Sequence, residues 1–229
     1  AKPITSGALV IPENYVAGGP LHRVIVRDND SVLDFLRSLR AVVSVEDYGS
    51  FSFVVVDGPR VGDVEGIRAL GLDLADESTL INLNGYLLDG ADAAATAARL
   101  AAIPPELGEP DAAREASLPE GGHRLRIVQF AGPVKDAWLD SLRQTGAHVV
   151  SYVPNNAYVL RADAEASAAI DALVAKPWVL GISTYLPAFK LRPELRRYIR
   201  FAAGHSTITA GAGWLAGVGV SVAGPLSSL

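Results

Sequence analysis

The chain has 229 residues, of which 49% are hydrophobic and 20% are charged, and this composition excludes a chain that is disordered throughout. The formal net charge of −5 argues against a nucleic-acid partner, because proteins of that class carry a basic stripe. The absence of cysteine excludes disulfides, thiolate metal ligands and cysteine nucleophiles.

The first predicted strand runs from His22 to Val26, and an amphipathic helix follows it. Two strand-forming runs at 42–45 and 51–56 then flank the turn Asp47-Tyr48-Gly49, a pattern that predicts a hairpin. A second helix and a closing strand, Leu80 to Leu83, complete this half. The apolar residues that recur at three- and four-residue spacing in its helices are Val32, Leu33, Leu36 and Leu39, and then Val64, Ile67 and Leu70.

A connecting segment separates this half from the next. Residues 93–102 are rich in alanine and predict a helix, which Pro104-Pro105 ends. Two glycines, Gly121-Gly122, close the segment.

The second half repeats the pattern of the first. It opens with His123-Arg124, as the first opens with His22-Arg23, 101 positions earlier. A helix, a hairpin with the turn Pro154-Asn155-Asn156, a second helix and a last strand follow. The residues that define these elements are Val134, Trp138, Leu139 and Leu142, then 148–153 and 157–160, then Ala166, Ile170 and Leu173, and finally 179–182.

Each half therefore predicts β-α-β-β-α-β, which is the ferredoxin-like pattern of an antiparallel sheet with two helices on one face, so the predicted class is α+β. Because a unit of about 70 residues is marginally stable alone, we expect the halves to pack on each other or on a partner. The predicted organisation is an N-terminal extension at 1–20, a first ferredoxin-like unit at 21–92, a linker at 93–121, a second unit at 122–192, and a helix with an uncharged, glycine-rich tail at 193–229.

The ends of the chain lead to two further expectations. The chain begins with Ala1 and contains no methionine, so we expect that a leader was removed and that the protein is secreted, although a truncated sequence would begin in the same way. The uncharged tail, 201–229, is interrupted by glycines, which disfavours a membrane span and favours the start of a following domain.

No set of residues in the sequence predicts catalysis. His22 and His123 stand at matching strand starts, and we interpret them, with His148, as structural. No histidine pair has helical metal-binding spacing, and no glycine-rich loop carries the lysine of a phosphate site. The acids of Glu46-Asp47 are explained by turn chemistry. We therefore expect no cofactor, no metal and no enzyme, but a binding, chaperone or inhibitor role.

Several segments resemble the N-terminal pro-region of large bacterial subtilisin-like serine peptidases. Those of the second half are 127–134 (IVQFAGPV), Trp138-Leu139, Gly146-Ala147, 152–159 (YVPNNAYV) and 185–191 (YLPAFKL). The first half is similar through 47–51 (DYGSF) and 86–89 (YLLD). In the tail, 204–211 (GHSTITAG) is similar to a protease histidine motif, but Ile208 stands where that motif has its histidine, so no catalytic triad can be assembled.

The resemblance implies a pro-domain that acts as an intramolecular chaperone and temporary inhibitor of a subtilisin-like catalytic domain, from the same precursor or a cognate one. It implies contacts through the solvent face of the second sheet and through a chain end that enters the cleft. The candidate contact residues flank the predicted hairpin turn: Tyr152, Asn155, Asn156 and Tyr158. The alternative is a stand-alone secreted structural or interaction protein that keeps the fold without a protease. An enzyme with a ferredoxin-like site is the least favoured interpretation.

Overall fold

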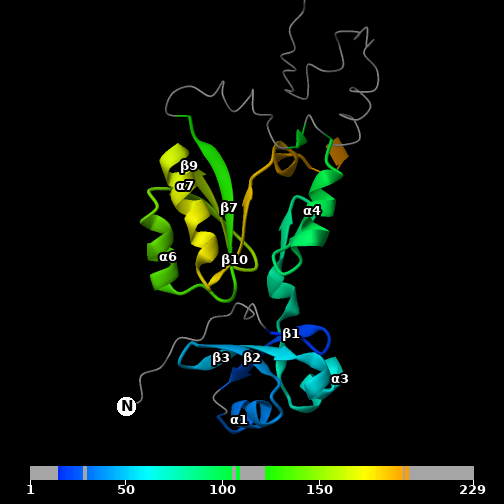
Figure 1. Cartoon of the computed structure of the whole chain (residues 1–229). Coiled ribbons are helices and arrows are strands. Elements are labelled where there is room, and N and C mark those ends of the chain that lie inside the picture. Colours follow the sequence, from blue (N-terminus) through cyan, green and yellow to red (C-terminus); the bar gives the residue numbers. More distant parts are fainter. Residues whose placement is uncertain (1–14, 28–29, 105–106, 109–121, 193, 196–229) are drawn as a thin grey trace, which may run out of the picture. The chain divides into compact units, whose positions relative to one another are not determined.

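The computed structural model describes residues 15–27, 30–104, 107–108, 122–192 and 194–195 (Figure 1). The chain divides into two compact units, 1–191 and 192–229, and the fold described below belongs to the first of them. Part of the predicted 93–121 linker (105–106 and 109–121) lies outside the described residues, as does the tail from 196 to 229, which includes Ile208.

The fold is α+β with antiparallel sheets, as the sequence predicts. The segment 21–74, here the first lobe, forms a four-stranded sheet in the order β2-β3-β1-β4. Its elements are β1 (Leu21–Arg27), α1 (Asp30–Ser38), β2 (Val42–Asp47), β3 (Phe51–Asp57), α2 (Gly58–Val61), α3 (Asp63–Ala69) and β4 (Asp73–Leu74). The predicted second helix, marked by Val64, Ile67 and Leu70, is α3, and Gly62, with φ 81°, separates it from the short α2 that precedes it.

The segment 124–184, here the second lobe, forms a second sheet in the order β10-β7-β9-β8. Its elements are β7 (Arg124–Phe130), α6 (Asp136–Arg143), β8 (His148–Val153), β9 (Ala157–Ala162), α7 (Ala164–Ala172), the 3-10 turn η3 (Leu173–Ala175) and β10 (Val179–Thr184). Asp163 caps α7 by accepting a hydrogen bond from the backbone N–H of Ala166. In both sheets the first and third strands of the lobe are central, and the second and fourth are edges.

One predicted strand has a different partner from the one expected. Leu80–Leu83 (β5) does not close the first sheet but pairs with Tyr86–Asp89 (β6) in a separate hairpin. The physical reason is the turn Asn84-Gly85, whose φ values of 51° and 83° suit a two-residue hairpin loop. The first sheet is closed instead by the two residues of β4, which follow α3 directly.

Three further elements connect or follow the lobes. Their bounds are η1 (Asp76–Thr79), α4 (Ala93–Ala101) and η4 (Pro187–Lys190). The predicted alanine-rich helix is α4, and Asp92 caps it by accepting a hydrogen bond from the N–H of Ala95.

The duplication is visible within single elements. The sequences of α1 and α6 align as DSVLDFLR and DAWLDSLR. In this alignment Val32 is the residue equivalent to Trp138. Both outer strands also carry an irregularity in pairing at the same Val-Val-Ser motif, between Val42 and Ser44 in β2 and between Val149 and Ser151 in β8. The strands β2 and β8 thus share an irregularity in pairing as well as a hydrophobic pattern, which supports the internal repeat.

The first lobe has its own hydrophobic core on the helix-bearing face of its sheet. Figure 1 shows α1 and α3 on this side of the first sheet. The buried residues of that core include Val24, Val26, Leu33, Leu36, Val54, Val56 and Ile67. Full burial of each large aliphatic side chain contributes about 1.5–3 kcal/mol.

A second cluster spans both lobes. It joins Phe53 and Val55, from the opposite face of the first sheet, to Phe130, Trp138 and neighbouring residues of the second lobe. The expectation that the halves pack on each other is therefore confirmed.

Candidate interaction site

The β8–β9 hairpin brings the four predicted contact residues together around one turn. Tyr152 and Tyr158 form a cross-strand pair, and their ring centroids are 5.3 Å apart in a T-shaped arrangement. Asn155 and Asn156 occupy the turn with φ values of 69° and 65°. Asparagine tolerates this left-handed region better than most residues, so the sequence folds locally as predicted.

Asn155 is engaged within the chain. Its Nδ2 donates hydrogen bonds to the carbonyl oxygens of Glu77 at 2.9 Å and Leu80 at 2.6 Å. The side chain of Gln129 reaches the same region, because its Nε2 lies 3.2 Å from the carbonyl oxygens of both Ser78 and Asn155. The hairpin turn is thus attached to the segment that follows the first lobe.

Tyr152 is the most accessible of the four candidates. Tyr152 is exposed, with 54% of its surface accessible to solvent, whereas the other three residues are half-buried. Tyr158 packs against Phe130 at a centroid distance of 5.9 Å, and the N–H of Asn156 donates to the Tyr152 hydroxyl at 3.3 Å. Of the predicted contact residues, Tyr152 is therefore the one whose ring a partner could cover.

The face of the second sheet opposite its helices is not the solvent face that the resemblance implied. Ile127 is only 1% exposed and Gln129 3% exposed on this face. The segment after β6 lies against it, since a Cβ built on Gly90 would come within 2.5 Å of Oε1 of Gln129 and 2.8 Å of Leu180 carbons. Nδ2 of Asn84 also donates to the carbonyl oxygen of Phe189 at 2.5 Å.

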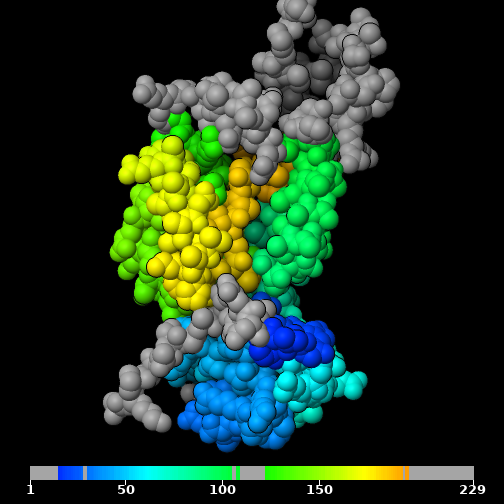
Figure 2. Space-filling view, viewed as in Figure 1, coloured from blue at the N-terminus to red at the C-terminus, as the bar shows by residue number. Residues whose placement is uncertain are grey.

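Figures 1 and 2 show the same arrangement. In Figure 1, α6 and α7 lie on one side of the second sheet and α4 lies on the other. In Figure 2, the green surface of α4 and β6 adjoins the gold surface of β10. The chain itself therefore covers the sheet face on which a partner was expected to dock.

The two lobes meet at a polar cluster around Lys135. Its ammonium group pairs with the buried carboxylate of Glu46, donates to the Asp47 carbonyl at 2.7 Å and lies 4.6 Å from the centre of the Tyr48 ring. The Tyr48 hydroxyl donates to the Pro133 carbonyl at 2.6 Å. Burial, reinforced by the Glu46 charge, raises the pKa of Tyr48, so this donor remains protonated.

His22 is held in a structural contact. Its Nδ1 lies 2.6 Å from Oδ2 of Asp76, and the other carboxylate oxygen of Asp76 accepts from the N–H of Arg23 at 2.6 Å. This pair ties β1 to η1, which explains a buried histidine at a strand start without catalysis. Within the described part of the chain, no group of three or more His, Asp or Glu side chains is arranged to hold a metal ion.

A buried carboxylate, Asp57, is a polar centre that sequence reasoning missed. It is fully buried, and its Oδ2 accepts hydrogen bonds from the Tyr15 hydroxyl at 2.7 Å, the Gly18 N–H at 3.2 Å and Nε of Arg60 at 3.0 Å. The Tyr15 bond is the largest influence that lowers the pKa of Asp57, and the Gly18 and Arg60 contacts add to it against the opposing effect of burial. The carboxylate fastens residues 15–18 to the end of β3.

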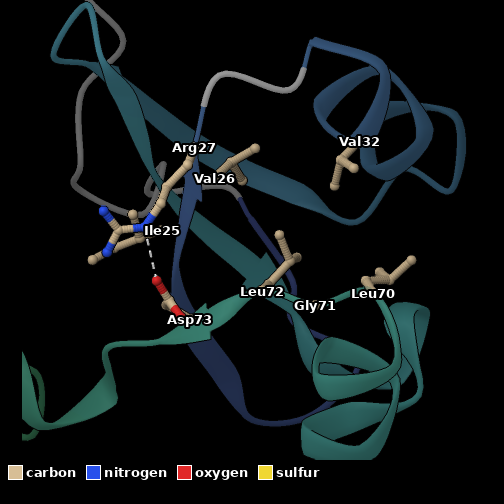
Figure 3. Close-up of a pocket in the computed structure, with 8 residues that line it drawn as sticks. All are labelled: Ile25, Val26, Arg27, Val32, Leu70, Gly71, Leu72 and Asp73. Carbon is tan, nitrogen blue, oxygen red and sulfur yellow. Dashed lines mark hydrogen bonds and ion pairs between the residues drawn. The ribbon is translucent and has the colours of Figure 1, made fainter.

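A small open cavity of about 90 Å³ lies between β1, α1 and the turn before β4 (Figure 3). Val26, Val32, Leu70 and Leu72 form its apolar side, and the 3.0 Å ion pair of Arg27 with Asp73 forms its polar side. The position of Val32 corresponds to Trp138 in the second lobe, whose ring stacks on Trp178 at 6.0 Å. At the equivalent position the second lobe has a tryptophan ring, whereas the first lobe has the shorter side chain of Val32, which lines the cavity.

Comparisons with known proteins give one partial match. A family model described as a domain of unknown function (DUF8729) matches residues 83–186, from the end of β5 to just beyond β10. No curated protein and no solved structure gave a significant match. In the described ranges, no helix has the length and apolar character needed to cross a membrane.

Proposed function

We propose that the chain is the non-catalytic pro-domain of a secreted subtilisin-like serine protease, built from two ferredoxin-like units. In this role it helps the catalytic domain to fold and inhibits it temporarily. The observation that carries the proposal is the second lobe, in which the segments similar to subtilisin-like pro-regions form two paired strands, the helix beside them and the hairpin turn. Both lobes also have the strand order 4-1-3-2, which is the order of a ferredoxin-like sheet.

A binding role without chemistry is supported by the way that the polar side chains are used. The imidazole of His22 contacts Asp76, the carboxylate of Asp57 holds the N-terminal segment, and that of Glu46 holds Lys135. Each of these groups has a structural partner within the chain. We therefore propose that the chain acts on its partner by contact alone.

The proposed protease contact includes Tyr152. This ring lies on the outer strand of the second sheet, where an added strand or loop could cover it. Asn155, Asn156 and Tyr158 are proposed to support it: the asparagines shape the turn and Tyr158 packs beneath the ring.

The experiment is an inhibition assay with the whole chain and a subtilisin-type protease. We expect slow, tight loss of peptide hydrolysis, and a higher refolding yield when the denatured catalytic domain is diluted with the chain present. Tyr152→Ala should weaken inhibition by about 5- to 30-fold, as for an aromatic contact residue. The matched control is Val174→Ala, another exposed apolar residue of the same lobe, which should inhibit as the wild type does.

One observation favours the alternative of a stand-alone structural or interaction protein. The open face of the second sheet is covered by the chain's own β5–β6 region. This face therefore offers no free surface for the protease contact that the resemblance implies. A chain of this kind would change neither the activity nor the refolding yield of the protease. That result would favour the alternative over the pro-domain.

A further inference from the structure

The equivalent outer strands of the two lobes, β2 and β8, differ in charge and in the exposure of their apolar residues. In the first lobe β2 ends in Glu46 and Asp47, and its irregular residue Val43 packs into the cluster shared by the lobes. In the second lobe β8 carries no acidic, lysine or arginine residue, and Val150 and Tyr152 are 52% and 54% exposed. Both strands have the same irregularity, so this defect does not account for the difference.

An uncharged outer strand with exposed apolar residues is the type of edge that pairs with another chain. Natural sheets discourage such pairing with charges or by covering the edge. The strand β2 carries acidic residues of this kind, Glu46 and Asp47. Among the described residues, β8 pairs with β9 on one side only, which leaves its outer backbone groups available for a further strand.

Charged residues that lie near the two ends of β8, on other elements, favour one direction of pairing over the other. At the start of the strand, His148 lies opposite the exposed Arg161 of β9. At its other end, the hydrogen bond from Asn155 to the Glu77 carbonyl places an exposed acidic residue beside the turn. Antiparallel pairing of β8 with a second β8 would bring the basic end of each copy to the acidic end of the other, whereas parallel pairing would bring like charges together.

We propose that the free chain self-associates through β8, with a second copy of the same chain paired antiparallel to it. The contact is isologous, because a two-fold axis relates identical strands. It covers Val150 and Tyr152 of both copies and joins the two sheets into a continuous one. The inference does not rest on the pro-domain proposal, since it concerns the chain without a protease. A protease that covers Tyr152 would displace the second copy.

Sedimentation velocity on the full chain tests the proposal directly. We expect a dimer whose population rises with concentration across the micromolar range that is typical of modest interfaces. Val150→Lys introduces a charge on the edge and should make the chain monomeric. The matched control Val174→Lys adds the same charge at an exposed site off the strand and should leave the dimer intact. Circular dichroism identifies any variant that has unfolded.

Charge reversal tests the antiparallel direction. Arg161→Glu should weaken the dimer, and combining it with Glu77→Arg should restore it, because the pair is then reversed rather than broken. The inference is overturned if the wild type remains monomeric at about 100 µM, a concentration well above the Kd of a specific interface. It is also overturned if Val150→Lys dimerises as well as Val174→Lys, or if the double charge reversal fails to recover a dimer that Arg161→Glu has weakened.

Discussion

Asn155 and Asn156 are neighbours in one turn with similar φ values, yet they make different hydrogen bonds. The Asn155 amide bridges two carbonyls of the segment 77–80, whereas the Asn156 backbone carbonyl accepts from the Phe130 N–H. Residue type and turn signal are the same for both. The difference arises because the segment 77–80 lies within hydrogen-bonding distance of the Asn155 side chain.

This difference leads to a paired prediction. Glycine keeps the positive φ at either position, so Asn155→Gly and Asn156→Gly preserve the turn. Asn155→Gly also removes the hydrogen bonds to Glu77 and Leu80, and we expect it to lower the free energy of unfolding by about 1–3 kcal/mol. Asn156→Gly should lower it by less than half as much. Urea denaturation measures both variants, and equal losses would contradict the anchoring role of Asn155.

The buried carboxylate of Asp57 predicts a pH dependence. Its folded-state pKa is lower than the ordinary value of 3.8, so the ionised group adds stability above that value. This contribution is lost as the pH falls from about 4 through the folded-state pKa, since the unfolded chain then binds the proton more readily.

The measurement compares the wild type with Asp57→Asn. The wild type should be more stable by about 1–3 kcal/mol at pH 7, because the variant lacks the negative charge that strengthens the hydrogen bonds from Tyr15, Gly18 and Arg60. The difference in unfolding free energy should shrink between pH 4 and pH 2. A difference that stays constant over this interval would contradict the assigned pKa direction.

At the scale of elements, local patterns were predictable and long-range ones were not. Hairpins 42–57 and 148–162 follow from β-branched runs around a turn. The two residues of β4 are too few to show a period, so no pattern identified them as the closing strand. Leu80–Leu83 has the composition of a strand, but composition does not name its partner. The nearby Asn84-Gly85 signal could have indicated the local hairpin.

The candidate site was predictable to the same degree. The turn that gathers Tyr152, Asn155 and Tyr158 is local, and its residues were identified from the sequence. The contacts of Asn155 with Glu77 and of His22 with Asp76 join residues 78 and 54 positions apart, and no spacing rule indicates them. The same holds for two of the three donors to Asp57, which lie 42 and 39 positions upstream.

The contact between the β6–α4 connection and β10 gives a prediction at this scale. Gly90→Ala would place a methyl group against Gln129 and Leu180, and we expect about 1–3 kcal/mol of destabilisation from this overpacking. Gly181→Ala is the matched control on the facing strand, where the added carbon meets Gly90 at an ordinary 3.8 Å. Thermal unfolding followed by circular dichroism compares them. If the two variants melt together, the close approach at Gly90 is wrong.

At the scale of the whole chain, the open faces of both sheets are covered by other parts of the chain. The open face of the first sheet packs on the second lobe through Phe53 and Val55, and the open face of the second is covered by the β5–β6 region. The strand β8 is then an outer edge with exposed apolar residues and no acidic, lysine or arginine side chain. The proposed binding role follows from this edge together with the pro-region resemblance.

The most direct measurement of that role is co-migration of the chain with a subtilisin-type catalytic domain. The two are mixed in equal amounts and separated by size exclusion with light scattering. The proposal predicts one species that contains both proteins and has suppressed peptidase activity. Two separate peaks at the masses of the free proteins, with a fully active protease, would contradict it.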